Sequence, residues 1–241
     1  MKTFKALLKI EYLLMLRSLS VLFLSIGMPV FFFLFYSTFA TESKNILKIM
    51  MFNMSAFSSI SFALFVLPFS LQEDRRNNRL NSLRYSSVPL WQYYTAKIIK
   101  VIFYDLLSCL LVFSLGHFVR GITMSALDWV TTGLLLMFGA LMFISLGLLL
   151  AYIQSSETLS ILSNILYIGL AIMGGLWMPV STFPEWLQVI SKVTPTYHFA
   201  NLFYHYLSHG IISLSSVVYL ISFFLVCLLG VYLVAQLLEA K

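Results

Sequence analysis

The sequence predicts an all-α integral membrane protein in which residues 1–241 form a single transmembrane domain with six spans. Of its 241 residues, 60% are hydrophobic and only 10% are charged, and its mean hydropathy is +0.93. About 20 apolar residues in a helix cross the ~30 Å hydrocarbon core, and only closed hydrogen-bonding structures survive in lipid. The long apolar stretches that meet this requirement are 19–40, 46–71, 101–118, 130–153, 158–178 and 211–238.

Residues 1–17 precede the first span and predict an amphipathic helix on the inner membrane surface. Lys2, Lys5 and Lys9 share one face of a helical wheel, and leucine and phenylalanine side chains gather opposite them. This pattern is typical of a helix that turns its lysines toward anionic headgroups. A cytoplasmic extension of the first span is the alternative. Glu11 falls in the apolar stripe, so we expect it to pack against protein, beside Arg17 or a partner subunit.

The first long apolar stretch, 19–40, is expected to be a transmembrane helix and not a signal peptide. It is longer than the ~7–15 residues of a signal core, and five further spans follow it. Pro29 lies inside the stretch and is expected to kink the helix, because proline removes a backbone hydrogen bond.

The distribution of Lys and Arg predicts that both termini of this multi-pass membrane protein are cytoplasmic. With six spans the termini share one side, and cytoplasmic loops are richer in basic residues. That side carries eleven basic residues: Lys2, Lys5, Lys9, Arg17, Arg75, Arg76, Arg79, Arg84, Lys97, Lys100 and Lys241. The other side carries four: Lys44, Lys48, Arg120 and Lys192. The net charge of +6 therefore indicates membrane orientation and gives no case for a nucleic-acid partner.

The cytoplasmic connector 72–97 is the most polar stretch of the chain. Leu80, Leu83 and Tyr85 have the spacing of a short amphipathic helix, which Pro89 then ends. A connector that only joins two spans needs a few residues. The greater length predicts a docking element, although a passive basic loop would also satisfy the positive-inside rule.

The outer segment 179–210 predicts two short helices between spans five and six. Pro184 and Pro195 suit the first positions of helices over 184–192 and 195–207. Both helices are too short and too polar to span, so we expect them at the outer interface or dipping into it as re-entrant helices.

A few polar side chains within the spans are candidates for chemistry. Asp105 is the only acid well inside a span, where an ionised group is costly, so it must face protein or water. Its functional interpretations are proton or cation coupling and contact with a cationic substrate; the structural alternative is a hydrogen bond to Ser108, Tyr104 or a neighbouring helix. Ser58 and Ser61 in the serine-rich second span either line a pathway or allow close helix packing.

Other reactive side chains give no strong site. His198, His205 and His209 could share one helical face, but they lack an accompanying acid, so interfacial packing is favoured over metal binding. Cys109 and Cys227 fall inside predicted spans and are expected to pack as small apolar residues.

The order and spacing of these motifs resemble the permease subunits of type-2 ATP-binding-cassette (ABC) transporters, in the bacterial export branch. The connector has an acidic and basic start, spaced leucines, a proline and a lysine: Glu73, Arg75, Arg76, Leu80, Leu83, Pro89 and Lys97. The outer segment shares Gly174, Gly175, Pro179, Pro184, Trp186, Leu187, Ile190 and Pro195 with the family pattern. The likeness covers nearly the whole chain.

The resemblance implies a transport subunit without catalysis of its own. The chain has no GxxxxGK[ST] phosphate loop, so ATP and Mg²⁺ would be bound by a separate ABC ATPase and no cofactor is expected here. The resemblance assigns ATPase coupling to Glu73, Arg75, Arg76, Leu80, Leu83 and Pro89. It also implies a dimer with a second copy or a sibling permease.

The implied cargo is amphipathic or hydrophobic: a drug, antibiotic, peptide or lipid exported through the membrane. The other class of function is a membrane protein that binds or confers immunity without transport, which would not need the long connector. A membrane enzyme is disfavoured because no acid–base or Ser-His-Asp arrangement is evident in the sequence.

Overall fold

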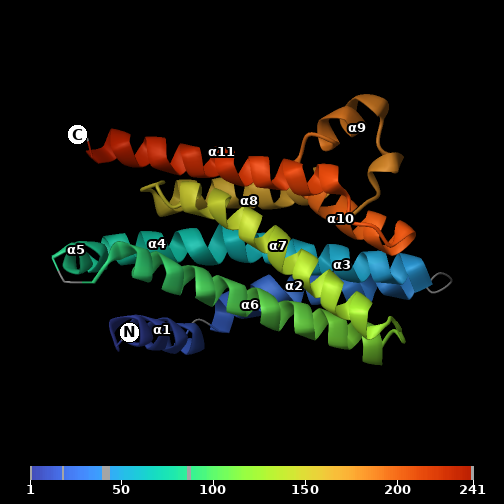
Figure 1. The fold of residues 1–241 in the computed structure, drawn as a ribbon, viewed down its shortest axis with the longest axis horizontal. Coiled ribbons are helices and arrows are strands. Elements are labelled where there is room, and N and C mark those ends of the chain that lie inside the picture. The colour runs from blue at the N-terminus through green and yellow to red at the C-terminus, as the bar shows by residue number, and fades with distance from the viewer. Residues whose placement is uncertain (1, 18, 40–43, 86–87, 240–241) are drawn as a thin grey trace.

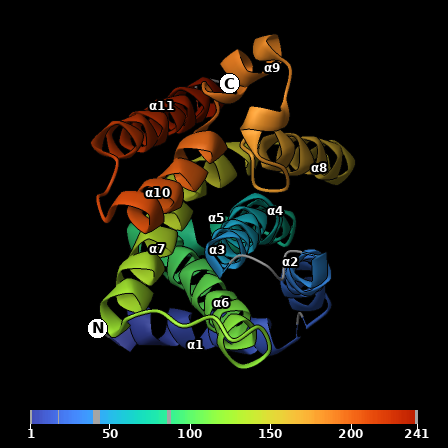
Figure 2. The ribbon, with the colours of Figure 1, turned by 90° about the vertical axis from the view of Figure 1, so that its right-hand side faces the viewer.

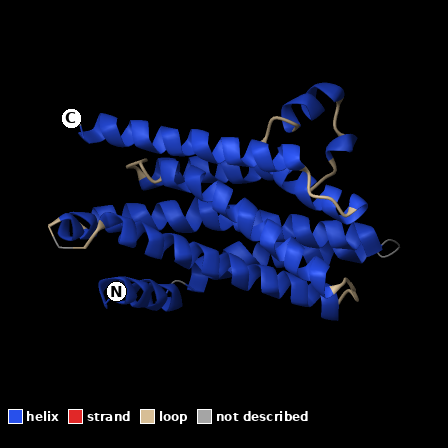
Figure 3. Cartoon of the chain, viewed as in Figure 1, coloured by secondary structure: helices blue, strands red, loops and turns tan. Residues whose placement is uncertain are grey.

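The computed structural model describes residues 2–17, 19–39, 44–85 and 88–239. Its described part is helical, with loops and turns but no strand (Figure 3). The elements are α1 (Lys2–Arg17), α2 (Leu19–Phe39), α3 (Lys44–Ser61), the π-helical η1 (Phe62–Val66), α4 (Leu67–Arg76), α5 (Arg79–Arg84), α6 (Leu90–Phe118), α7 (Ala126–Leu150), α8 (Ser156–Met173), the short η2 (Val180–Thr182), α9 (Glu185–Ser191), α10 (Pro195–His209) and α11 (Leu214–Glu239).

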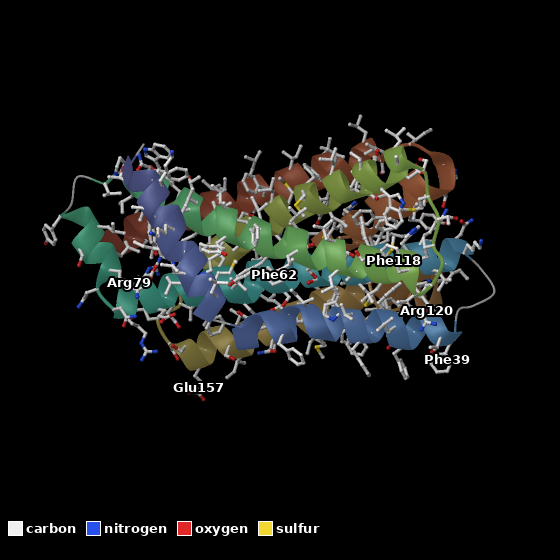
Figure 4. All side chains as sticks on the ribbon, turned by 90° about the horizontal axis from the view of Figure 1, so that it is seen from below. Phe39, Phe62, Arg79, Phe118, Arg120 and Glu157 are labelled. Carbon is white, nitrogen blue, oxygen red and sulfur yellow. The ribbon has the colours of Figure 1, made fainter. Side chains whose placement is uncertain are left out.

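The long helices run side by side in an elongated bundle, and both ends of the described chain lie at the same end of it (Figure 1). We call this the basic end; it holds Lys5, Lys9, Arg75, Arg76, Arg79, Lys97 and Lys100. The outer helices α9 and α10 lie toward the opposite end, and Figure 4 shows Arg79 and Phe39 at the two extremes.

Within the described residues, five helices are long and apolar enough to cross a membrane. They are Lys44–Arg76, Leu90–Phe118, Ala126–Leu150, Ser156–Met173 and Leu214–Leu237. The predicted first span corresponds to α2, which contributes the shorter apolar segment Ser25–Phe39 and lies against α3. The helical membrane class is confirmed. The predicted crossing by α2 stays a prediction, because its apolar segment is shorter than the other five.

Two predicted boundaries differ from the structure. The third span was expected to begin at residue 101, but α6 begins at Leu90, directly after Pro89. The helix continues through Lys97 because two carboxylates neutralise that side chain. The second span was expected to end at residue 71, but the helix runs through η1 and α4 to Arg76. Half of the charged connector, 72–76 and 90–97, is therefore helical extension of its neighbours, and Arg79–Arg84 forms the separate helix α5.

The N-terminal helix α1 lies across the bundle axis and packs on α6 (Figures 2 and 4). This is the orientation expected of an interfacial helix. An extension of the first span would continue along the axis of α2, and α1 instead crosses that axis (Figure 4).

The α3–η1–α4 helix is the centre of the bundle. Of its most apolar stretch 83% is buried, against 11% for α11 at the edge. Stacked and edge-on aromatic pairs fill its surroundings; the Phe57 and Tyr167 rings, for example, stack at 4.2 Å. The predicted outer helices correspond to α9 and α10, which begin directly after Pro184 and at Pro195.

We expect Gly147→Ala to destabilise the bundle. The backbone of α7 lies directly against η1, and a Cβ at Gly147 would overlap the carbonyl oxygen of Ala63, a backbone atom that cannot rotate away. Overpacking of this kind costs about 1–3 kcal/mol. Unfolding of the purified protein in detergent by SDS titration measures the loss.

Gly169→Ala in α8 is the matched control, because a Cβ there meets no other atom within 4 Å. It should leave stability unchanged or raise it slightly, since alanine favours the helix. Equal stability of the two variants would contradict the close packing of α7 on η1.

Candidate functional site

A buried ammonium group joins three helices at the basic end. Lys97 of α6 is 1% exposed, and its Nζ lies 2.7 Å from Glu11 Oε1 of α1 and 2.6 Å from Asp74 Oδ2 of α4. The same Nζ donates to Ser70 Oγ at 2.7 Å. Removing an ammonium from water costs several kcal/mol unless charges and hydrogen bonds compensate it. Here two carboxylates and a hydroxyl compensate it.

Three further side chains complete this group. Lys100 Nζ lies 3.0 Å from Glu11 Oε2, and Arg79 Nη1 lies 3.0 Å from Asp74 Oδ1. Tyr93 OH donates to Asp74 Oδ2 at 2.7 Å. We call Glu11, Asp74, Arg79, Lys97 and Lys100 the ion cluster. It holds the interfacial helix α1, the end of α4, the start of α5 and α6 as one unit.

The other side of α4 is tied to the connector between α7 and α8. Gln72 Nε2 donates to the carbonyl oxygens of Ile153 (2.9 Å) and Gln154 (3.1 Å), and Ser156 Oγ donates to Gln72 Oε1 (2.7 Å). Arg75 and Arg76 extend the contact: Arg75 Nη1 donates to the Ala151 carbonyl oxygen at 2.6 Å and Arg76 Nη1 to Ser156 Oγ at 3.1 Å. These three α4 side chains form what we call the connector clamp: Gln72, Arg75 and Arg76.

The predicted coupling residues divide into inward and outward groups. Leu80 is buried in an apolar cluster with residues of η1, α4 and α6, and Leu83 packs against that cluster. The two leucines therefore cover the chain's own core and do not project from it. Glu73 is exposed, and Pro89 is the exposed residue before α6.

Tyr85 is the side chain that projects from this end. It follows α5 and is 94% exposed, the largest exposed fraction among the large apolar and aromatic residues described. The turn between α4 and α5 leads to it, with Asn78 in the left-handed region (φ 54°), which asparagine tolerates. The spacing predicted one helical face for Leu80, Leu83 and Tyr85. In the structure α5 ends at Arg84, so Tyr85 leaves the helix and is exposed while Leu80 is buried.

A cavity of about 710 Å³ lies beside the ion cluster. Aromatic and aliphatic side chains from α2, η1, α4 and α8 make its walls, among them Met28, Phe65, Phe69 and Tyr167. Lys97, Lys100 and Arg79 line its charged part. The space is therefore amphipathic, with an apolar wall and a charged end.

The three polar candidates within the spans have different surroundings. Ser61 lines the cavity. Ser58 donates to the Ser25 carbonyl oxygen at 3.0 Å and lies 2.7 Å from Ser108 Oγ. Asp105 is fully buried between α6 and α3, where Ser59 Oγ donates to its Oδ1 at 2.6 Å. All three side chains therefore join helices, because Ser61 Oγ also donates to Ser25 Oγ of α2 at 3.2 Å, and of the three only Ser61 lines the cavity.

The three candidate histidines lie apart in two groups at the opposite end. The His198 ring stacks on Tyr219 at 3.9 Å and its Nε2 lies 3.0 Å from the Lys192 carbonyl oxygen. Burial lowers the pKa of His198, although the bond to that carbonyl works in the opposite direction. His205 and His209 form a separate ring contact. In the described part of the chain no three His, Cys, Asp or Glu side chains gather as a metal site would require.

Comparisons with known proteins agree with this architecture. Residues 2–208, from α1 into α10, match the family model described as "ABC-2 type transporter". A protein of Bacillus subtilis (strain 168) named "Putative transport permease YvfS" is 29% identical over 181 residues, which cover 73% of this chain and 74% of that protein.

We expect Lys97→Met to lower the free energy of unfolding by about 3–5 kcal/mol, because it leaves Glu11 and Asp74 buried without their shared cation. Arg79→Ala is the control: its side chain is 46% exposed, and pairs of this kind contribute at most about 1 kcal/mol. SDS titration of the detergent-purified variants measures both.

Neutralising the two acids should restore part of the loss. The triple variant Lys97→Met, Glu11→Gln, Asp74→Asn removes the two buried carboxylate charges that lose their shared cation and should be more stable than Lys97→Met alone. If Lys97→Met costs no more than Arg79→Ala, the ion cluster does not hold the basic end together.

Proposed function

Because the chain belongs to the ABC-2 type transporter family, we propose that it is the permease subunit of an ATP-driven exporter. In this proposal a separate ABC ATPase binds ATP and Mg²⁺ and hydrolyses the nucleotide. The observation that carries the proposal is the α4–α5 segment at the basic end. Tyr85, directly after α5, is exposed, and α4 is tied through Lys97 to α6 and α1 and through Gln72 to the connector between α7 and α8.

Coupling requires that a force applied at this turn reach the membrane helices. The ion cluster links the turn to α1 and α6, and the connector clamp links α4 to the junction of α7 and α8. A displacement of α5 is therefore transmitted to both sides of the cavity. Closure of the ATPase on nucleotide would bias the bundle between two arrangements, inward-facing and outward-facing.

The docking contact is proposed to centre on Tyr85. Tyrosine and arginine are enriched among the residues that dominate interface energetics. Among the described side chains of the α4–α5 segment, Tyr85, Arg76 and Arg79 are exposed. Leu80 and Leu83 act differently from the sequence expectation: they hold α5 against the core so that Tyr85 is presented. Glu73 and Pro89 are the remaining exposed candidates of the expected coupling set.

The basic end is proposed to face the cytoplasm of a bacterial cell. Its excess of lysine and arginine supports this orientation through the positive-inside rule. With α2 as a further crossing beside the five long apolar helices, the chain has six spans and both termini are cytoplasmic.

The amphipathic cavity supports a cargo with both apolar and polar parts, such as a drug, antibiotic, peptide or lipid. Its walls offer aromatic and aliphatic surface, and its charged part lies at the basic end, where cytoplasmic cargo would enter. Six helices enclose little space for such a cargo. We therefore propose that two permeases, identical or sibling, form the complete pathway.

We expect Tyr85→Ala to reduce association with the ATPase at least tenfold, because an aromatic anchor contributes about 2 kcal/mol or more to an interface. The test uses an ABC ATPase that we expect in the neighbouring reading frame, co-expressed with this chain. Recovery of the ATPase with tagged permease in detergent measures the association.

Trp91→Ala is the matched control. Trp91 is also a large exposed aromatic residue (64%), but it lies in the first turn of α6 and not on the docking turn. Both variants should insert in the membrane at wild-type levels. Full ATPase recovery with Tyr85→Ala would exclude the docking contact, and absence of any ATPase with the wild-type chain would favour a membrane protein that binds or confers immunity without transport.

A further inference from the structure

Two prolines within the apolar helices each leave a backbone carbonyl without its α-helical donor. A serine hydroxyl from a neighbouring helix donates a hydrogen bond to each of these carbonyl oxygens. Proline has no N–H, so the carbonyl four residues earlier loses its α-helical hydrogen bond. For Pro29 that carbonyl belongs to Ser25, and Ser58 Oγ of α3 donates to it at 3.0 Å. For Pro68 it belongs to Leu64, and Ser163 Oγ of α8 donates to it at 3.0 Å.

The second of these sites coincides with the π-helical segment η1. There the N–H of Leu67 bonds to the carbonyl of Phe62, one residue beyond the α-helical partner. Pro68 follows at once, so two interruptions of the regular hydrogen-bond ladder lie next to each other in the Lys44–Arg76 helix. π segments and prolines are the usual places where helices bend. Phe62 lies midway along the bundle in Figure 4, so the bend would lie at mid-depth.

Helix α8 contacts the Lys44–Arg76 helix on both sides of η1. Beyond it, Tyr167 stacks on Phe57 of α3, and at the bend Ser163 bonds to Leu64. On the α4 side, Ser156 bonds to Gln72. α8 is thus attached to the outer arm (α3), to the joint (η1) and to the inner arm (α4), in that order along its length.

We propose that η1 is a hinge and that Ser163 is a positioning residue whose hydrogen bond holds this hinge closed. We call this role of Ser163 the catch. The Ser163 hydroxyl bond to Leu64 holds the inner arm α4 straight against α8, and the bond opens when α4 swings with the docking turn. The proposal rests on the proposed function, in which α4 carries the displacement from the ATPase. Ser163 and Leu64 are both fully buried, so no water replaces the hydroxyl when it is removed, and the Leu64 carbonyl is left unsatisfied.

The dependence of the Ser163 hydrogen bond on Pro68 distinguishes a catch from a side chain that only packs. Pro68 supplies no N–H to Leu64, and the π-helical bond from Leu67 to Phe62 shifts the neighbouring donors out of α-helical register, so the Leu64 carbonyl oxygen accepts from Ser163 instead. In a Pro68→Ala variant the backbone itself can supply the donor, and the Ser163 hydroxyl becomes dispensable. A role in packing alone would make the serine equally important in both backgrounds.

Amide hydrogen exchange of residues 62–69 in the detergent-purified full chain tests this directly and needs no ATPase. Ser163→Ala should speed exchange there about tenfold, because it removes the bond that closes the hinge. Ser163→Thr keeps the hydroxyl and should restore protection. In the Pro68→Ala background, Ser163→Ala should change exchange less than about twofold.

Ser58→Ala is the matched control, since it removes the equivalent bond at Ser25 and should affect exchange around residues 25–29 but not 62–69. Equal effects of Ser163→Ala with and without Pro68 would overturn the catch. No effect in either background would overturn it as well.

The transport part of the inference has its own readout. In the complex with the ATPase, Ser163→Ala should alter the rate of permease-dependent ATP hydrolysis severalfold and Ser163→Thr should return it to the wild-type rate. If exchange responds but hydrolysis does not, the hinge exists and its role in coupling is wrong. If the Tyr85 experiment fails while exchange responds, the proposed docking fails and the catch stands.

Discussion

The burial of the Lys97 ammonium group is the constraint on which the basic end of the molecule depends. A charge removed from water must find compensation within the protein, and Lys97 finds it in Glu11 and Asp74, carboxylates from two other helices. This requirement fixes where α1 crosses the bundle and where α4 ends. It also explains why α6 continues as a helix through residues that the charge pattern assigns to a loop.

The class of the protein and its main elements could be predicted from sequence, because hydrophobic length and helical periodicity are local properties. The pairing of Glu11 with Lys97 could not, since it joins distant parts of the chain and periodicity gives only the face on which a residue lies. The spacing of Leu80 and Leu83 correctly predicted an apolar face on α5. It did not say whether that face meets a partner or the chain's own core.

The polar residues within the spans show the same limit. A serine in an apolar helix can line a pathway, join two helices or donate to a backbone carbonyl that lacks its helical partner. Its sequence neighbours do not distinguish these roles. The structure assigns Ser61 to the cavity and Ser58 to the carbonyl left open by Pro29. The prolines were the available signal: each one in a membrane helix demands a donor from elsewhere, and a buried hydroxyl on a neighbouring helix is the natural supplier.

The ion cluster and the connector clamp both attach to α4, and η1 lies directly before α4 in the same Lys44–Arg76 helix. A rigid helix from Lys44 to Arg76 would carry any displacement of its basic end through the whole bundle, and would meet the resistance of its most buried part. A hinge at η1 lets α4 move while the aromatic rings of Tyr167 and Trp177, which pack around Phe57, stay in place. The strong attachments of α4 to α1, α6 and the α7–α8 connector then determine which elements move with α4. These elements either line the amphipathic cavity or lie next to an element that lines it.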